Sequence, residues 1–100
     1  MNDMDEQEVK DQKRRQQIAV YVEQVKNGSH PALTGSQKQI DWATKIRTSY
    51  LEWAIAQINF YERAGGDPIT TGLPTLLHNA FVHLRHAEAS YWINNRSDLK

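Results

Sequence analysis

The stretch from Ser36 to Gly65, SQKQIDWATKIRTSYLEWAIAQINFYERAG, decides the fold. On a helical wheel its apolar residues cover more than half of the circumference. They are Ile40, Trp42, Ala43, Ile46, Tyr50, Leu51, Trp53, Ala54, Ile58 and Tyr61. A helix with so wide an apolar arc needs neighbours on two sides, so we expect it in the middle of a bundle.

The ends of this central helix carry recognisable signals. Ser36 followed by Gln39 is typical of a capping box, and Gly65-Gly66 is typical of a helix end. Thr48 and Ser49 are modest helix formers, so we expect a kink or break near them.

Two further helices flank the central one. The first runs from about Asp5 to Lys26 and ends at Asn27-Gly28. Only its second half carries an apolar stripe, so its start should project, and residues 1–8 form a polar N-terminus. The third begins near Pro74 and continues to Ile93, with residues 97–100 as a loose tail. Its core stripe comprises Leu76, Leu77, Ala80, Phe81, Leu84, Ala87 and Tyr91.

The fold class is therefore all-α, a small bundle of three to five helices in one domain, 1–100. The chain has no cysteine, which excludes disulfide frameworks and thiolate metal sites. Met1 to Glu8 is acidic and polar, unlike a signal peptide, and no apolar run approaches the roughly 20 residues of a membrane span. We expect the protein in the cytoplasm.

Catalytic chemistry is not indicated. No nucleophile elbow or phosphate loop occurs, so we predict neither an enzyme nor a cofactor. His83 and His86 are three positions apart on a helix, but a metal site needs further ligands at defined spacing. We interpret them as part of a solvated polar face and predict no metal site.

A DNA-binding alternative rests on residues 35–47, a turn followed by a helix. Lys38, Gln39, Lys45 and Arg47 are of types that contact phosphates and base edges. The 12 basic and 12 acidic residues cancel, however, and zero net charge weakens long-range attraction to DNA.

An apolar strip lies opposite the core stripe of the third helix. Val82, Ala89 and Ile93 follow one another there, bordered by Arg85. Such a patch marks a partner site, unless the N-terminal half of the first helix folds over it. The sequence leaves both interpretations open.

A resemblance adds to this picture. The run Pro31-Ala32-Leu33-Thr34-Gly35-Ser36, with Lys38-Gln39-Ile40, Trp42-Ala43 and Ile46-Arg47 after it, resembles a motif of small proteins from phages and other bacterial mobile elements. A second block in those proteins resembles Ala89, Trp92-Ile93 and Arg96 of this chain. Here, however, Asn94 stands where an aspartate is more familiar. We expect Trp42 and Ile46 to point inward and meet Trp92, with Arg47 or Arg96 on an indole face.

Length, helical make-up and neutral charge together resemble type I-F anti-CRISPR proteins. The resemblance implies a stoichiometric inhibitor that binds subunits of a host crRNA-guided surveillance complex and blocks recognition of target DNA, without binding nucleic acid itself. Overall neutrality requires any acidic contact to be local, and Glu52, Glu62 and Asp67 are the candidates. The contacted subunit and the oligomeric state stay open.

Overall fold

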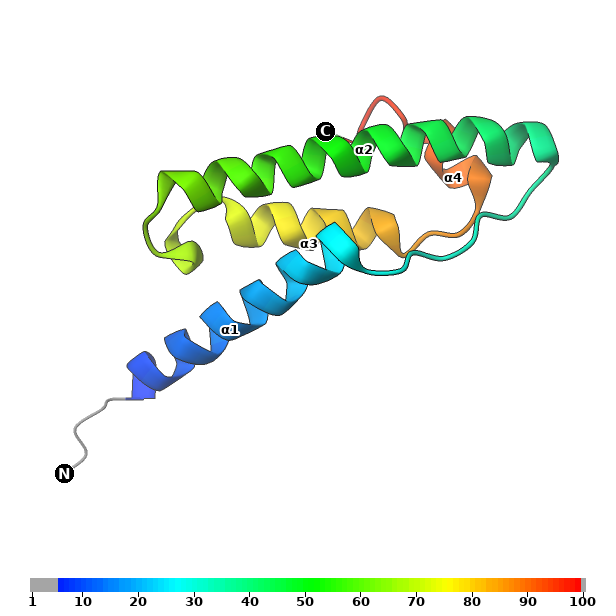
Figure 1. Ribbon diagram of the computed structural model, residues 1–100. Helices are drawn as coiled ribbons and strands as arrows, with labels where there is room; N and C mark the ends of the chain where they lie inside the picture. The colour runs from blue at the N-terminus through cyan, green and yellow to red at the C-terminus, as the bar shows by residue number, and fades with distance from the viewer. Residues whose placement is uncertain (1–5, 100) are drawn as a thin grey trace.

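The helix α2 (Gln37–Ala64) runs along most of the protein in the computed structural model, which describes residues 6–99 (Figure 1). Around it lie three more helices and a short 3-10 turn: α1 (Glu6–Asn27), η1 (Pro68–Thr70), α3 (Leu73–Leu84) and α4 (Ala89–Asn94). The predicted all-α bundle is confirmed. It is elongated, with a longest dimension of 62 Å and a radius of gyration of 16.5 Å, against about 13 Å for a compact chain of this length.

The predicted capping box begins α2. The Ser36 hydroxyl accepts a hydrogen bond from the Gln39 amide at 3.2 Å, and the Gln39 side chain accepts one from the Ser36 amide at 3.1 Å. The helix then continues through Thr48 and Ser49, so the predicted break does not occur. Both residues are exposed, and no glycine or proline interrupts the stretch. Gly65, with φ of 77°, ends the helix in a conformation that favours glycine.

The helix α1 packs only along its second half. Ile18, Val22 and Val25 are buried, whereas residues 6–10 are exposed, and Figure 1 shows this end leading away from the bundle. Of the predicted polar N-terminus, residues 6–8 are exposed helix and residues 1–5 lie outside the described residues. A side chain at Gly28 would place its Cβ 2.4 Å from the Gln24 carbonyl oxygen, so close approach explains this glycine.

The predicted third helix is two helices. It breaks over residues 85–88, where the chain runs beside the segment that joins α1 to α2. The Thr34 amide donates to the Ala87 carbonyl at 2.8 Å, and the Ala89 amide donates to the Thr34 carbonyl at 2.8 Å. These bonds satisfy backbone groups that an unbroken helix would have used internally.

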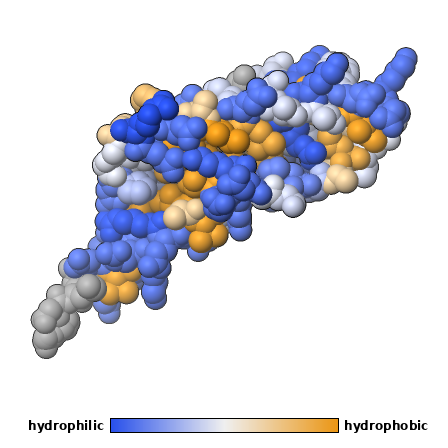
Figure 2. All heavy atoms as spheres, viewed as in Figure 1, coloured by the Kyte–Doolittle hydropathy of each residue, from blue (hydrophilic) through white to orange (hydrophobic). Residues whose placement is uncertain are grey.

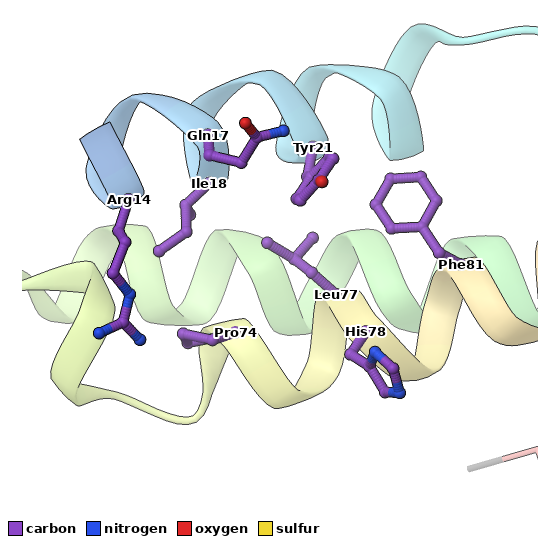
Figure 3. A pocket seen from close by; sticks show the side chains of 8 residues that line it. All are labelled: Arg14, Gln17, Ile18, Tyr21, Pro74, Leu77, His78 and Phe81. Carbon is purple, nitrogen blue, oxygen red and sulfur yellow. The ribbon is translucent and has the colours of Figure 1, made fainter. Parts of the chain in front are cut away.

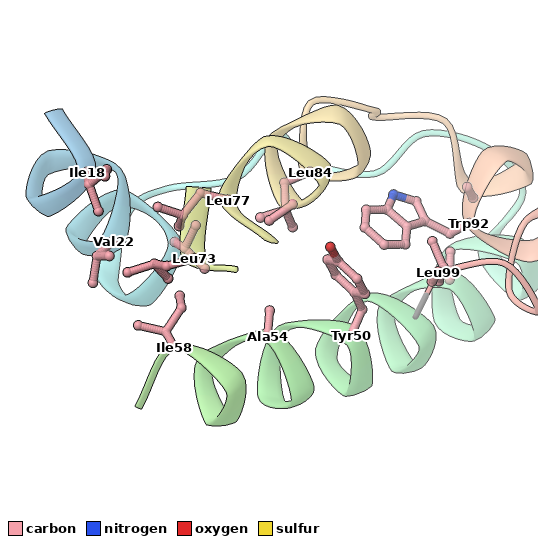
Figure 4. Close-up of a cluster of buried hydrophobic side chains, with 14 residues drawn as sticks. Ile18, Val22, Tyr50, Ala54, Ile58, Leu73, Leu77, Leu84, Trp92 and Leu99 are labelled. Carbon is pink, nitrogen blue, oxygen red and sulfur yellow. The ribbon is translucent and has the colours of Figure 1, made fainter. Parts of the chain in front are cut away.

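The core lies between α2 and the other helices, and Figure 4 shows it as one continuous cluster. Because α2 contacts α1, α3 and α4, the prediction of a central helix is confirmed. Tyr50, Ala54 and Ile58 face inward from α2 (Figure 4). Leu99 is only 7% exposed, so the prediction of a loose tail over 97–100 was wrong at this residue. Lys100 lies outside the described residues.

Candidate protein-binding surface

A groove of about 370 Å³ opens between α1 and α3 (Figure 3). Its walls are mostly apolar, and its lining residues are Arg14, Gln17, Ile18, Tyr21, Pro74, Leu77, His78 and Phe81. At one end Tyr21 and Phe81 meet edge to face, with ring centroids 4.9 Å apart. An external apolar groove with a polar rim is the kind of surface that binds a partner.

The sequence of α1 explains why the groove exists. The buried stripe of this helix begins at Ile18, and the preceding position on the same face, Arg14, is a charged residue. The apolar packing of the helix on the bundle therefore starts at Ile18, and the wall of α3 opposite Arg14 and Gln17 stays uncovered. Figure 2 shows the hydrophobic surface that results among the hydrophilic side chains of this face.

An ion pair links α1 to the residue before η1. The Arg15 guanidinium donates to both carboxylate oxygens of Asp67, at 2.9 and 2.6 Å. The hydrogen bond from Arg15 lowers the pKa of Asp67, and the Ile69 amide also donates to this carboxylate. A bidentate pair has a defined geometry, so it sets the position of α1 against η1.

The predicted acidic contacts do not form one face. Asp67 is held by Arg15, and Glu62 accepts a hydrogen bond from Lys26 at 2.8 Å. Glu52 is exposed and lies ten positions before Glu62, about 15 Å along the helix axis. Reversing all three charges would break two internal ion pairs, so this triple variant would test the fold together with any interface.

The predicted outer strip of the third helix is dispersed by the break. Ala89 is 0% exposed and belongs to the core, so its place in the strip was wrong. Val82 is half-buried, and Ile93 is half-buried and packs against the core. Arg85 is exposed at the end of α3. The N-terminal half of the first helix leads away from the bundle and does not cover this strip. Instead, α4 packs on α2 and takes Ala89 and Ile93 with it.

The histidines at the end of α3 are not a solvated face. The His83 ring nitrogen Nδ1 and the Tyr91 hydroxyl are hydrogen bonded at 2.6 Å, and His86 stacks on Tyr91 with ring centroids 3.6 Å apart. Burial, followed by the charge of His86, lowers the pKa of His83. The Trp92 indole donates to the His86 carbonyl at 3.1 Å. This aromatic cluster was missed because its members come from α3, from α4 and from the break between them, which the sequence analysis joined into one helix.

The DNA-binding alternative loses two of its four side chains to internal contacts. Gln39 closes the capping box, and Arg47 donates to the Pro31 carbonyl at 2.6 Å. Lys38 and Lys45 stay exposed. Trp42, predicted to point inward, is 48% exposed, whereas Ile46 is half-buried and Trp92 is buried.

Within residues 6–99, no helix combines the length and apolar character that crossing a membrane requires. Over the same residues, no group of three or more His, Asp or Glu side chains is arranged to hold a metal ion. Comparisons of the chain with protein-family models, with curated proteins and with solved structures find no match.

Proposed function

We propose that the protein is a stoichiometric protein-binding inhibitor and that the groove between α1 and α3 is its contact with the partner. The observation that carries the proposal is the groove itself, about 370 Å³ of mostly apolar wall open on the outside of the protein. Apolar contacts buried in such a pocket, with polar side chains around them, dominate the binding energy of protein interfaces.

The resemblance of the sequence supports a specific partner, the type I-F crRNA-guided surveillance complex of a host cell. In this proposal the protein acts as an anti-CRISPR protein. It covers part of the complex and so blocks recognition of target DNA. The structure favours an apolar contact over acidic mimicry, because Glu62 and Asp67 are engaged within the protein.

The test fills the groove without removing any core side chain. Gln17 is exposed and lines the groove, so Gln17→Trp places an indole where the partner would bind. Gln16 is the adjacent exposed glutamine and does not line the groove, so Gln16→Trp is the matched control. Binding to the purified surveillance complex is measured by pull-down, with and without nuclease.

We expect Gln17→Trp to weaken binding by about tenfold or more, since blocking a central pocket removes a dominant contact. Gln16→Trp should bind like the parent protein. In parallel, the parent should block target DNA binding by the complex and should not bind duplex DNA alone. Equal binding by both variants would exclude the groove. Absence of any binding to the complex would exclude this partner.

A further inference from the structure

A row of side chains follows the outer face of α2 at coiled-coil spacing. Its members are separated alternately by four and three positions, the spacing of a helix seam that packs against another helix. They are Trp42, Ile46, Ser49, Trp53, Ala56 and Phe60, and we call them the outer row. Phe60 is 57% exposed and Trp42 is 48% exposed, at the two ends of the row. Both are large apolar side chains exposed on the surface.

The two halves of the outer row differ in shape. Beside the first half lies a cleft of about 440 Å³, whose floor includes Ile46 and Tyr50 and whose sides include Arg96 and Leu99. The second half carries Trp53, which is half-buried and packs against the core, and Phe60, which stands out from the surface. One half is therefore hollow where the other half projects.

We propose that the outer rows of two copies of this chain pack against each other in antiparallel directions, about a two-fold axis near Leu51. In this register Phe60 faces Trp42 of the second copy, Ala56 faces Ile46 and Trp53 faces Ser49. Each half of one copy then meets the complementary half of the other, as a two-fold interface requires. Phe60 of each copy enters the cleft of the other, and the exposed edge of Trp53 packs on Ser49.

The sizes of the side chains favour this direction over the parallel one. In the antiparallel register the small Ser49 and Ala56 receive the larger Trp53 and Ile46 of the second copy. In a parallel pair Trp53 would meet Trp53 and Ser49 would meet Ser49, so a crowded layer would follow an empty one. Both crowding and cavities are destabilising in a packed interface.

Charges along the edge of the row do not decide the pairing. Lys45 and Glu52 lie on the same edge, and in the antiparallel register each Glu52 lies between Glu52 and Lys45 of the second copy. Glu52 of the second copy repels this carboxylate and Lys45 of the second copy attracts it, so the two electrostatic contributions oppose each other. The apolar side chains of the row therefore supply the binding energy.

The expected contact area is small for a dimer. The outer row spans about 27 Å of helix, and two such rows with their clefts bury on the order of 1,000 Å² in total. This is the lower limit for a specific interface. We therefore expect a reversible dimer that forms at micromolar concentrations.

Sedimentation equilibrium of the purified full chain tests the dimer. Phe60→Asp places a charge in the apolar contact, and we expect the dimer dissociation constant to rise by about a hundredfold or more. Val20→Asp is the control, because Val20 is an exposed apolar residue, 51% accessible, on α1 and outside the row. It should leave the dissociation constant unchanged. Circular dichroism verifies that each variant is folded.

A second variant covers the case in which Phe60→Asp fails to fold. Ser49 is exposed, and Ser49→Trp enlarges the position that must receive Trp53. We expect a folded monomer. The proposal is overturned if the parent chain is monomeric up to concentrations of about 100 μM, or if both variants dimerise like the parent.

Distances between spin labels establish the direction of pairing. The chain has no cysteine, so Glu52→Cys and Lys38→Cys each provide one labelling site. An antiparallel pair about Leu51 places the labels at position 52 within about 20 Å and those at position 38 about 40 Å apart. Similar short distances at both positions would show parallel pairing and overturn the register. Gln17→Trp should leave the dimer intact, so this test is independent of the proposed function.

Discussion

Arg96 lies over the indole ring of Trp42, with its Cζ atom 5.1 Å from the ring centroid. The contact confirms the expectation that Arg96 rests on an indole. The same guanidinium donates to the Ile93 carbonyl. Arg96 thereby links α2 to the chain after α4, and Leu99 is buried beside Ile46 and Tyr50.

The buried Leu99 leads to a first prediction. Leu99→Ala should lower the free energy of unfolding by about 2 kcal/mol, near the lower end of the range for buried leucines because the site is terminal. Arg96→Gln should cost about 0.5–1 kcal/mol, the energy of an exposed cation–π contact. Urea denaturation of the two variants measures both. A Leu99→Ala variant as stable as the parent would mean that residues 97–99 do not pack on α2.

His83 leads to a prediction about pH. Burial lowers the pKa of His83 in the folded protein below its ordinary 6.5. At pH values between the folded-state pKa of His83 and 6.5, the unfolded chain binds a proton that the folded chain does not. The free energy of unfolding therefore rises with pH in this range. The contribution of His83 is complete above about pH 6.5 and is lost as pH falls through the folded-state pKa.

His83→Gln should therefore reduce the slope of unfolding free energy against pH between about 7 and 5. His78→Gln is the control, because His78 is exposed on the same helix. Urea denaturation at a series of pH values gives both slopes. Equal slopes for the parent and the His83 variant would contradict the assignment.

The parts of the fold that were predictable are those that neighbouring residues determine. The capping box at Ser36 and the inward face of Tyr50, Ala54 and Ile58 follow from spacing alone. The break at residues 85–88 contains neither glycine nor proline, and its backbone is hydrogen bonded to Thr34, more than 50 positions earlier. Helical periodicity reports only on residues close together in the sequence, so it could not predict that contact.

The candidate site was less predictable for the same reason. The carboxylates of Glu62 and Asp67 appear available in the sequence, but their partners Lys26 and Arg15 come from α1. The wheel of α2 also placed Trp42 in the apolar arc without showing that the neighbours of α2 cover only part of it. Its 48% exposure depends on where α4 and the C-terminal turn pack.

The Arg15–Asp67 pair leads to a third prediction. Asp67→Asn keeps an oxygen that accepts from the Ile69 amide but removes the negative charge that pairs with Arg15. We expect a lower melting temperature at neutral pH. Because the folded-state pKa of Asp67 is lowered, its contribution is present above about pH 3.8 and is lost as pH falls through the folded-state pKa. The parent and the variant should therefore converge in acid, whereas the exposed Glu52→Gln control should follow the parent throughout.

Two residues of α2, two positions apart, lead to the last prediction. Ile58 is 0% exposed and faces the core, whereas Phe60 is 57% exposed and belongs to the outer row. Ile58→Ala should lower the free energy of unfolding by about 2–5 kcal/mol, because it leaves a cavity among well-packed neighbours. Phe60→Ala should cost far less in the monomer, since the ring contacts Tyr61 but is mostly in solvent.

Denaturation is measured at two protein concentrations, one well below and one well above the dimer dissociation constant. At the higher concentration Phe60→Ala should lose the extra stability that dimerisation gives the parent, whereas Ile58→Ala should keep that increment. A concentration-independent midpoint for the parent would contradict the dimer, and equal costs of the two variants at low concentration would contradict the assignment of the inner and outer faces of α2.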